Sequence, residues 1–347
     1  MIQKNIQVKP GSVMKSRKSK SDLVTLDEFI IENQRQFPQA TGELSQLLRD
    51  ITLACRIIAR QANDSVLNDI KNRKNLTGYN RLDALREFAV DQFRYALDRS
   101  GIVRLMVTAF SNNYIRLSAA DGKYIVVLHP IEGIPNMGYN ASAASVFAIY
   151  QHDLYAEDLS DHFLRPGDDQ VASGYILYGS SAMLVFTTVG LGVSFFTLDD
   201  DVGEFFLAQR DIRIPESAPY FSCNTGLELH MDENDQNILD YLRAKSGSKF
   251  RYIGSLSADI HRMILDGGVF LYPANKKIPD GKLSLLYECA PIAQIVENAG
   301  GIATDGKQRI MSKVPRSIHS KTPFYAGSNE IMKSIELVRS GEKIVEN

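Results

Sequence analysis

Two short stretches of the chain carry residue types that could bind a phosphate or a metal ion. Residues 41–44 (Thr-Gly-Glu-Leu) open an expected helix. The first backbone N–H groups of a helix can receive a phosphate, although the same run is also an ordinary helix start. His129 and Glu132 follow an expected strand, and with Glu288 they could form a His/carboxylate set suited to a transition metal. The alternative is that they pair with each other or with Arg86.

The overall composition excludes several classes of protein. The 347 residues are 44% hydrophobic, which is enough for the core of one two-part domain or two fused ones. A net charge of −2 gives no reason to expect nucleic acid or an anionic membrane as a partner. No apolar run approaches the roughly 20 residues of a membrane-spanning helix. Three scattered cysteines exclude a disulfide framework or a closed zinc site and favour a reducing compartment.

Residues 1–23 are expected to form a disordered basic tail. Residues 15–20 (Lys-Ser-Arg-Lys-Ser-Lys) have no apolar stretch beside them, so a secretory signal is excluded. An organellar transit peptide remains open, because the first acidic residue is Asp22. Without such a signal the expected location is cytoplasmic.

Hydrophobic periodicity predicts a mixed order of helices and strands. Helices are expected from residue 25, from residue 41, and over residues 85–97, 236–243, 258–265 and 285–299. Strands are expected over residues 103–108, 124–128, 144–150, 174–178, 182–189, 193–198 and 269–272. The polar stretch 63–80 is expected to be a loop. This order implies a layered α/β or α+β fold with a seam near residues 205–215.

Several runs in the same order carry a family resemblance. They are residues 41–44, 174–180 (Gly-Tyr-Ile-Leu-Tyr-Gly-Ser), 203–205 (Gly-Glu-Phe), 251–255 (Arg-Tyr-Ile-Gly-Ser), 272–277 (Tyr-Pro-Ala-Asn-Lys-Lys), 281–283 (Gly-Lys-Leu) and 286–291 (Leu-Tyr-Glu-Cys-Ala-Pro). From about residue 25 to residue 338 the chain resembles class I fructose-1,6-bisphosphatase. The resemblance implies a layered α-β-α-β-α sugar-phosphatase fold, usually in a tetramer. It also implies an N-terminal allosteric domain of AMP-binding type, residues 24–210, and a sugar-phosphate-binding domain, residues 211–340.

Members of this family hydrolyse the 1-phosphate with Mg²⁺ ions held by a cluster of carboxylates, and most of the matching positions here carry other residues. The two acids of the Asp-Pro-Leu-Asp-Gly-Ser-Ser motif fall on His129 and Glu132. The remaining acid positions fall on Tyr79, Arg86, Ala109, Phe110 and Glu288. Only Glu288 of these is still an acid of the expected kind. Glu132 and Glu288 are therefore weak metal candidates.

At the positions where the family contacts its ligands, more residues match the family than at the acid positions. The sugar-phosphate contacts fall on Asn224, Arg251, Tyr252, Tyr272 and Lys282, with Arg251 implied to serve the neighbouring subunit's site. The AMP contacts fall on Thr41, Gly42, Glu43, Ser45, Lys123 and Tyr124. Arginine, lysine and tyrosine suit anion binding, because they supply bidentate, point-charge and directional hydrogen-bond contacts. Gln151 replaces an arginine near the nucleotide.

The resemblance and its departures lead to one hypothesis and two alternatives. The chain is expected to be a fructose-1,6-bisphosphatase-like protein without catalysis, which keeps a fructose 6-phosphate type of pocket and serves as a regulatory or structural subunit. No cofactor is expected, and Mg²⁺ would enter only if the protein is active. The alternatives are an active sugar-bisphosphate phosphatase with a rearranged metal site, in gluconeogenesis or the Calvin cycle, and a sensor of sugar phosphate or AMP. Expected partners are a sugar phosphate, AMP, and a homotetramer or a hetero-oligomer with an active paralogue.

Overall fold

The computed structural model describes residues 23–34, 42–71, 79–153, 158–216, 219–245 and 247–342, with the side chains of residues 34, 63–71 and 79–81 left out. The expected basic tail up to residue 22, and Thr41, lie outside these ranges. Within them, no helix is long and apolar enough to cross a membrane.

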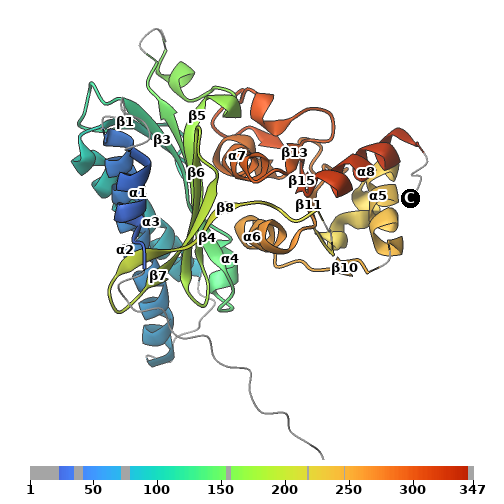
Figure 1. Cartoon of the computed structure of the whole chain (residues 1–347), viewed down its shortest axis with the longest axis horizontal. Helices are drawn as coiled ribbons and strands as arrows, with labels where there is room; N and C mark the ends of the chain where they lie inside the picture. Colours follow the sequence, from blue (N-terminus) through green and yellow to red (C-terminus); the bar gives the residue numbers. More distant parts are fainter. Residues whose placement is uncertain are drawn as a thin grey trace, which may run out of the picture.

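Helices and sheets alternate in five layers (Figure 1). Helices α1 (Leu26–Gln34), α2 (Glu43–Lys71) and α3 (Tyr79–Ser100) cover one face of a large sheet. Helices α6 (Leu256–Asp266) and α7 (Ala290–Asn298) lie between that sheet and a smaller one. Helices α5 (Glu233–Ala244) and α8 (Asn329–Ser340) cover the outer face of the smaller sheet. The α-β-α-β-α fold expected from the sequence is confirmed.

The large sheet has eight strands, and its central strands are buried on both faces. In spatial order they are β2 (Ile115–Arg116), β1 (Val103–Thr108), β3 (Tyr124–Glu132), β4 (Ala143–Gln151), β5 (Gln170–Tyr178), β6 (Ala182–Thr188), β7 (Val193–Asp199) and β8 (Glu204–Ile212). β1 and β3 are parallel, and the other neighbours are antiparallel. Because helices cover both faces, β4 is buried along nearly its whole length and shows no polar alternation.

The smaller sheet carries the C-terminal part of the chain. Its order is β10 (Lys249–Phe250), β9 (Tyr220–Cys223), β11 (Val269–Tyr272), β15 (Phe324–Gly327) and β13 (Ile302–Thr304). β12 (Leu283–Ser284) pairs separately with β14 (Lys321–Thr322). The short helix α4 (Ile134–Met137) follows β3, and 3₁₀ turns span Leu159–His162, Gly167–Asp169, Thr225–His230 and Ile310–Ser312.

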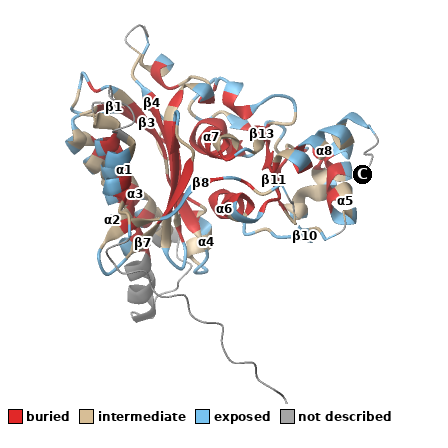
Figure 2. Ribbon diagram, in the orientation of Figure 1, coloured by how far each residue is buried: buried red, intermediate tan, exposed pale blue. Residues whose placement is uncertain are grey.

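One core cluster joins the two sheets through the middle helices. Tyr175 of β5 packs in the same cluster as Ile260 of α6, Ile295 of α7 and Phe270 of β11. Figure 2 shows α6 and α7 as largely buried elements between the sheets. The two halves of the chain therefore share apolar packing.

Two element boundaries differ from the sequence prediction near the N-terminal half. The expected loop at residues 63–80 is wrong at both ends, because α2 continues to Lys71 and α3 begins at Tyr79, and its middle, residues 72–78, lies outside the described ranges. The sequence keeps Val66, Leu67 and Ile70 at helical spacing, a pattern that the polar residues around them obscured. The strand expected to close at residue 128 runs on to Glu132, which places both His129 and Glu132 within β3.

Two further differences lie toward the C-terminal half. The expected seam near residues 205–215 is largely occupied by β8, the edge strand of the large sheet. The helix expected over residues 285–299 begins as a π-helical turn, Leu285–Cys289, before α7. Pro291 lacks a backbone N–H, so a regular i→i−4 hydrogen bond cannot form there, and the wider turn accommodates it.

Gly281, directly before Lys282, should be sensitive to substitution. Its φ is +84°, and an added Cβ would lie 2.2 Å from the backbone carbonyl carbon of Thr322. We expect Gly281→Ala to lower the free energy of unfolding by about 3 kcal/mol, from backbone strain and overlap together. Gly203→Ala is the matched control, since Gly203 has a φ of +75° but open space around it and should lose about 1 kcal/mol. Equal losses in urea denaturation would contradict the packing described here.

Candidate functional site

The end of β3 meets the first turn of α6 through a buried carboxylate. Glu132 is 6% exposed. It accepts hydrogen bonds from Ser255 Oγ at 2.8 Å and from the backbone N–H groups of Leu256 at 3.0 Å and Ser257 at 3.3 Å. The N-terminus of a helix carries partial positive charge, so a carboxylate is stabilised there. Glu132 thus acts as the counter-charge of α6 and not as a free ligand.

The next acid along this surface, Glu288, lies in the π-helical turn. Its Oε2 accepts a hydrogen bond from the Ser284 backbone N–H at 2.6 Å. Its Oε1 lies 3.3 Å from His129 Nδ1, within ion-pair distance but without hydrogen-bond alignment. Both side chains are largely buried. His129 therefore pairs with Glu288, whereas the sequence left open a pair with Glu132 or Arg86.

The pKa values of the two acids move in opposite directions. Burial raises the pKa of Glu132, the charge of Glu288 raises it further, and the Ser255 hydroxyl offsets this in part. Burial also acts to raise the pKa of Glu288. The contact with His129 and the Ser284 backbone N–H outweigh that burial, so its pKa is lowered overall. At neutral pH Glu288 is therefore the better stabilised carboxylate.

Arg86 and Phe110, two of the other positions that match family acids, line a hollow together with the acidic residues Asp83, Glu87 and Asp91. The Arg86 guanidinium lies 4.8 Å from the Phe110 ring centroid and donates to Asp83 Oδ1 at 2.8 Å. Phe110 in turn meets the His129 ring edge-on at 5.4 Å. Ala109 is half-buried and donates its backbone N–H to Leu128. Tyr79 begins α3, and its side chain lies outside the described part.

This arrangement offers few oxygen ligands to a cation. Among the described residues, no three His, Cys, Asp or Glu side chains are grouped so that they could hold a metal ion. Mg²⁺ prefers several oxygen ligands in octahedral geometry. A metal at this place would have to draw Glu132 and Glu288 away from the hydrogen bonds that now hold them.

Four of the five sugar-phosphate candidates lie together beside Glu132. Asn224 Nδ2 donates to Tyr272 Oη at 3.5 Å, and the Lys282 ammonium lies 5.6 Å from the Tyr272 ring centroid. Burial raises the pKa of Tyr252, and the charges of Tyr272 and Glu132 raise it further, so these groups lie within electrostatic reach of one another. A cation, an amide and two phenols thus converge next to the first turn of α6.

Arg251 is not part of this group within the chain. Its side chain is exposed and donates to the Phe250 carbonyl at 2.7 Å. The loop that carries it is fixed by Asp259, which is fully buried and accepts hydrogen bonds from the backbone N–H groups of Ile253 and Gly254. Sequence reasoning missed this carboxylate. The available signal was its place in the first turn of α6.

The described nucleotide candidates line one cavity of about 440 Å³. They are Gly42, Glu43, Ser45, Lys123 and Tyr124, and Gln151 joins them. Lys123 Nζ lies 2.7 Å from Glu43 Oε1, so its charge is already partnered. Phe29 and Leu191 line the apolar part of the cavity. A phosphate in this cavity would compete with Glu43 for Lys123.

Comparison with known proteins identifies the class of fold first. A structure of the Leishmania major fructose-1,6-bisphosphatase in holo form superimposes with a TM-score of 0.84 at 31% identity, over 91% of this chain and 99% of that one. A T-state structure of the same enzyme gives 0.82. Together with the converging anion-binding groups, this defines a layered sugar-phosphatase fold.

The sequence comparisons then give the family. The family models of the N-terminal and C-terminal domains of fructose-1,6-bisphosphatase match residues 24–210 and 214–340. The class 1 fructose-1,6-bisphosphatase 2 of Salinibacter ruber is 41% identical over 335 residues, which covers 92% of each chain. The chain belongs to the fructose-1,6-bisphosphatase family, a family of carbohydrate metabolism.

This membership corrects one expectation from the sequence. No cofactor was expected, but the fructose-1,6-bisphosphatases to which the chain is so similar are Mg²⁺-dependent enzymes, and no finding shows that this chain lacks a metal. The expectation was wrong because it was drawn from the loss of individual acids. Those losses concern only the metal-binding acids of the family motif, whereas the similarity to the family extends over both domains.

Removal of the Glu132 carboxylate should destabilise the fold. Glu132→Ala leaves the Ser255 hydroxyl and two backbone N–H groups without their acceptor, so we expect a loss of about 2–3 kcal/mol in the free energy of unfolding. Glu132→Gln retains one carbonyl acceptor and should lose less. The exposed Asp200→Ala, in the turn between β7 and β8, is the control and should change stability by about 0.5 kcal/mol at most. A neutral Glu132→Ala in chemical denaturation would rule out this role.

Proposed function

We propose that this member of the family binds a sugar phosphate of the fructose 6-phosphate type and turns over phosphate esters very slowly, as a regulatory or structural subunit. The proposal rests on a difference between the two ends of the candidate site, the Lys282 end and the Glu288 end. At one end a lysine and tyrosine hydroxyls converge. At the other end the carboxylates are held by the protein's own groups.

The binding part of the proposal rests on Lys282, Tyr272, Tyr252 and Asn224. The Lys282 side chain is exposed, and its ammonium supplies a point charge for a phosphate. The phenol groups of the two tyrosines supply directional hydrogen bonds, and Asn224 orients one of them. Arg251 would add a bidentate contact to the site of a neighbouring subunit.

The slow turnover rests on the charge balance at the other end. Phosphoryl hydrolysis needs positive groups that stabilise the negative charge developing on the transferred phosphate. Arg86 is stacked on Phe110 and paired with Asp83. A metal held there would have Glu132 and Glu288 as its carboxylates and would experience the repulsion of the Arg86 guanidinium.

Turnover of fructose 1,6-bisphosphate is the first test. With Mg²⁺ or Mn²⁺ we expect phosphate release at least ~10³-fold below an ordinary enzyme rate of ~10 s⁻¹, because charge stabilisation in the transition state is weakened. The Salinibacter ruber relative, assayed in the same buffer, is the positive control. Turnover near ~10 s⁻¹ would overturn the proposal and favour the active alternative.

A gain-of-function variant sharpens this test. Arg86→Asp combined with Ala109→Glu and Phe110→Glu places acids where the family resemblance implies them. If weak charge stabilisation limits turnover, this triple variant should hydrolyse the bisphosphate measurably faster in Mg²⁺ than the natural chain. A folded triple variant that shows no gain would mean that other positions limit catalysis.

Binding of fructose 6-phosphate is measured separately by calorimetry. Lys282→Ala should weaken binding at least about tenfold, because it removes a charge-assisted contact worth ~1.5–3 kcal/mol. The exposed Lys276→Ala is the matched control and should bind as the natural chain does. Absence of heat at millimolar ligand would show that the pocket is not used. Parallel titrations in EDTA and in Mg²⁺ report what a metal adds.

The active alternative has one observation in its favour. Glu132 and Glu288 have pKa values shifted in opposite directions by their surroundings, a pattern common where one acid group works as a proton donor and another as an anion. A rearranged metal site would use these two side chains. The turnover assay above separates this alternative from slow catalysis.

The remaining parts of the proposal concern AMP and assembly. The cavity around Lys123 is proposed as the AMP site, and calorimetry with AMP as titrant separates a sensor from a sugar-phosphate binder. A homotetramer is proposed because Leu53 and Ile57 are exposed on one face of α2, one turn apart.

The boundary between the proposed domains, residues 24–210 and 211–340, falls at the end of β8. A cytoplasmic location stays a prediction from the sequence.

A further inference from the structure

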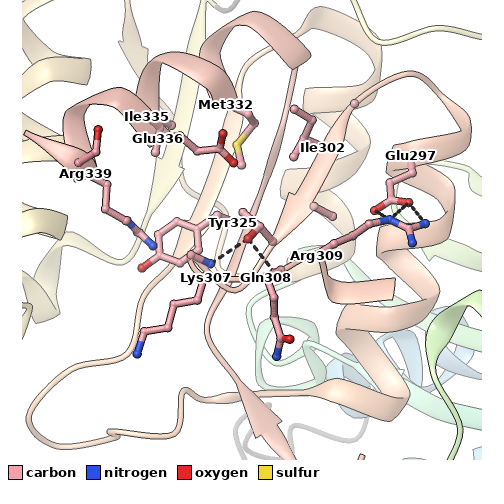
Figure 3. Close-up of a pocket in the computed structure, with 15 residues that line it drawn as sticks. Glu297, Ile302, Lys307, Gln308, Arg309, Tyr325, Met332, Ile335, Glu336 and Arg339 are labelled. Carbon is pink, nitrogen blue, oxygen red and sulfur yellow. Dashed lines mark hydrogen bonds and ion pairs between the residues drawn. The ribbon is translucent and has the colours of Figure 1, made fainter. Parts of the chain in front are cut away.

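A hollow of about 650 Å³ lies away from both ligand sites named so far. It is formed between α8 and the loop at residues 305–309, above β13 and β15 (Figure 3). Its lining includes Ile302, Lys307, Tyr325, Met332, Ile335 and Arg339.

The small sheet separates this hollow from the sugar-phosphate candidates. Strand β11 pairs with β15 so that Leu271 lies opposite Tyr325, and Tyr272 lies opposite Phe324. Successive side chains of a strand point to opposite faces, so Tyr325 and Tyr272 lie on opposite faces of the sheet. The core clusters agree, because Tyr325 packs with α5 and α8 while Tyr272 packs with the middle helices. A ligand in the hollow would not touch the sugar-phosphate residues.

The floor of the hollow is apolar and well packed. Tyr325, Met332 and Ile335 are each at most 3% exposed and belong to the core cluster between the small sheet and its outer helices. Burial of apolar ligand surface on such a floor is favourable at about 25 cal/mol per Å². The floor therefore suits the body of an organic molecule better than a bare inorganic ion.

A fixed cation borders this floor. The Arg339 guanidinium lies 4.2 Å from the Tyr325 ring centroid, and its Nη2 donates to Asp235 Oδ1 at 2.8 Å. Gly306, whose φ is +92°, lies against the Arg339 guanidinium, and a Cβ added to Gly306 would overlap Arg339 Nη1. Figure 3 shows the guanidinium beside the tyrosine ring. Its position is thus set before any ligand arrives, which reduces the ordering cost of binding.

Lys307 supplies a second positive charge at the mouth. Its side chain is exposed and extends from the loop on the open side (Figure 3). Across the described ranges its ammonium has no hydrogen-bond or ion-pair partner. Arg309, two residues on, is in contrast already paired with both Glu297 and Asp168. The exposed Glu336 lies on the opposite wall and lowers the local positive potential.

We propose that this hollow is a binding site for a small organic anion, with a carboxylate or phosphate group on an apolar or aromatic body. The anionic group contacts Lys307 and Arg339, and the body lies on Tyr325, Met332 and Ile335. Lys307 supplies the charge without a partner among the described residues, and Arg339, which also pairs with Asp235, supplies its remaining guanidinium N–H donors.

Methyl NMR can observe this site without interference from the other anion pockets. The chain has nine methionines, and the Met332 methyl signal is assigned by its loss in Met332→Leu. The full-length protein, labelled at its methionine methyl groups, is titrated with phenyl phosphate and with benzoate. We expect a saturable shift of the Met332 signal with at least one of these probes, while Met263, in the core on the other face of the small sheet, stays unchanged. Inorganic phosphate, which lacks the body, should bind more weakly.

Three variants, each of which removes one charge, should affect the Met332 response differently. Lys307→Ala should weaken the Met332 response about tenfold, and Glu336→Gln should strengthen it, because the first removes an attractive charge and the second a repulsive one. Lys333→Ala, on the exposed side of α8 and outside the lining, should leave it unchanged. The proposal is overturned if the Met332 signal does not move at millimolar probe, or if Lys307→Ala and Lys333→Ala behave alike.

Discussion

The architecture depends on one buried carboxylate that joins the large sheet to the middle helices. Glu132 ends β3 and receives three hydrogen bonds from the first turn of α6. A buried acid without such partners would be strongly unfavourable, so the strand end and the helix must be placed together. The small sheet packs on α6 and α7, and its position relative to β3 follows from this contact.

The same contact explains the contrast between the two ends of the candidate site. A carboxylate that neutralises a helix N-terminus contributes little negative potential to the surface beyond it. Glu288 is likewise engaged with His129 and the Ser284 backbone. At this end Arg86 is paired with Asp83, and Glu87 and Asp91 line the same hollow, while at the other end Lys282 is exposed. A metal ion must compete with the protein's own partners for Glu132 and Glu288.

The sequence predicted the elements whose pattern is local, and missed contacts between distant residues. Continuous apolar runs predicted β1, β4 and β11, because strands covered on both faces need such runs. The partner of Glu132 could not be predicted, since Ser255 lies 123 positions away. The expected ligand groups come together in part, with Asn224, Tyr252, Tyr272 and Lys282 in one place, while Arg251 lies apart. Comparing single residues with the family motif could not predict whether the protein needs a metal ion. The affinity for a metal depends on the hydrogen-bond partners of each acid in the fold, which a single sequence does not show.

The small sheet gives two ligand surfaces a common support. Tyr272 and Tyr325 stand on adjacent strands, one register step apart, so one faces the sugar-phosphate group and the other the hollow under α8. Any movement of β15 that adjusts the hollow must also move its paired strand β11, because the backbone hydrogen bonds between them hold the register. Asp235 binds both Tyr325 and Arg339, which fastens α5 and α8 to the same strand. The two ligand surfaces therefore share one sheet as their support and have no contact residue in common.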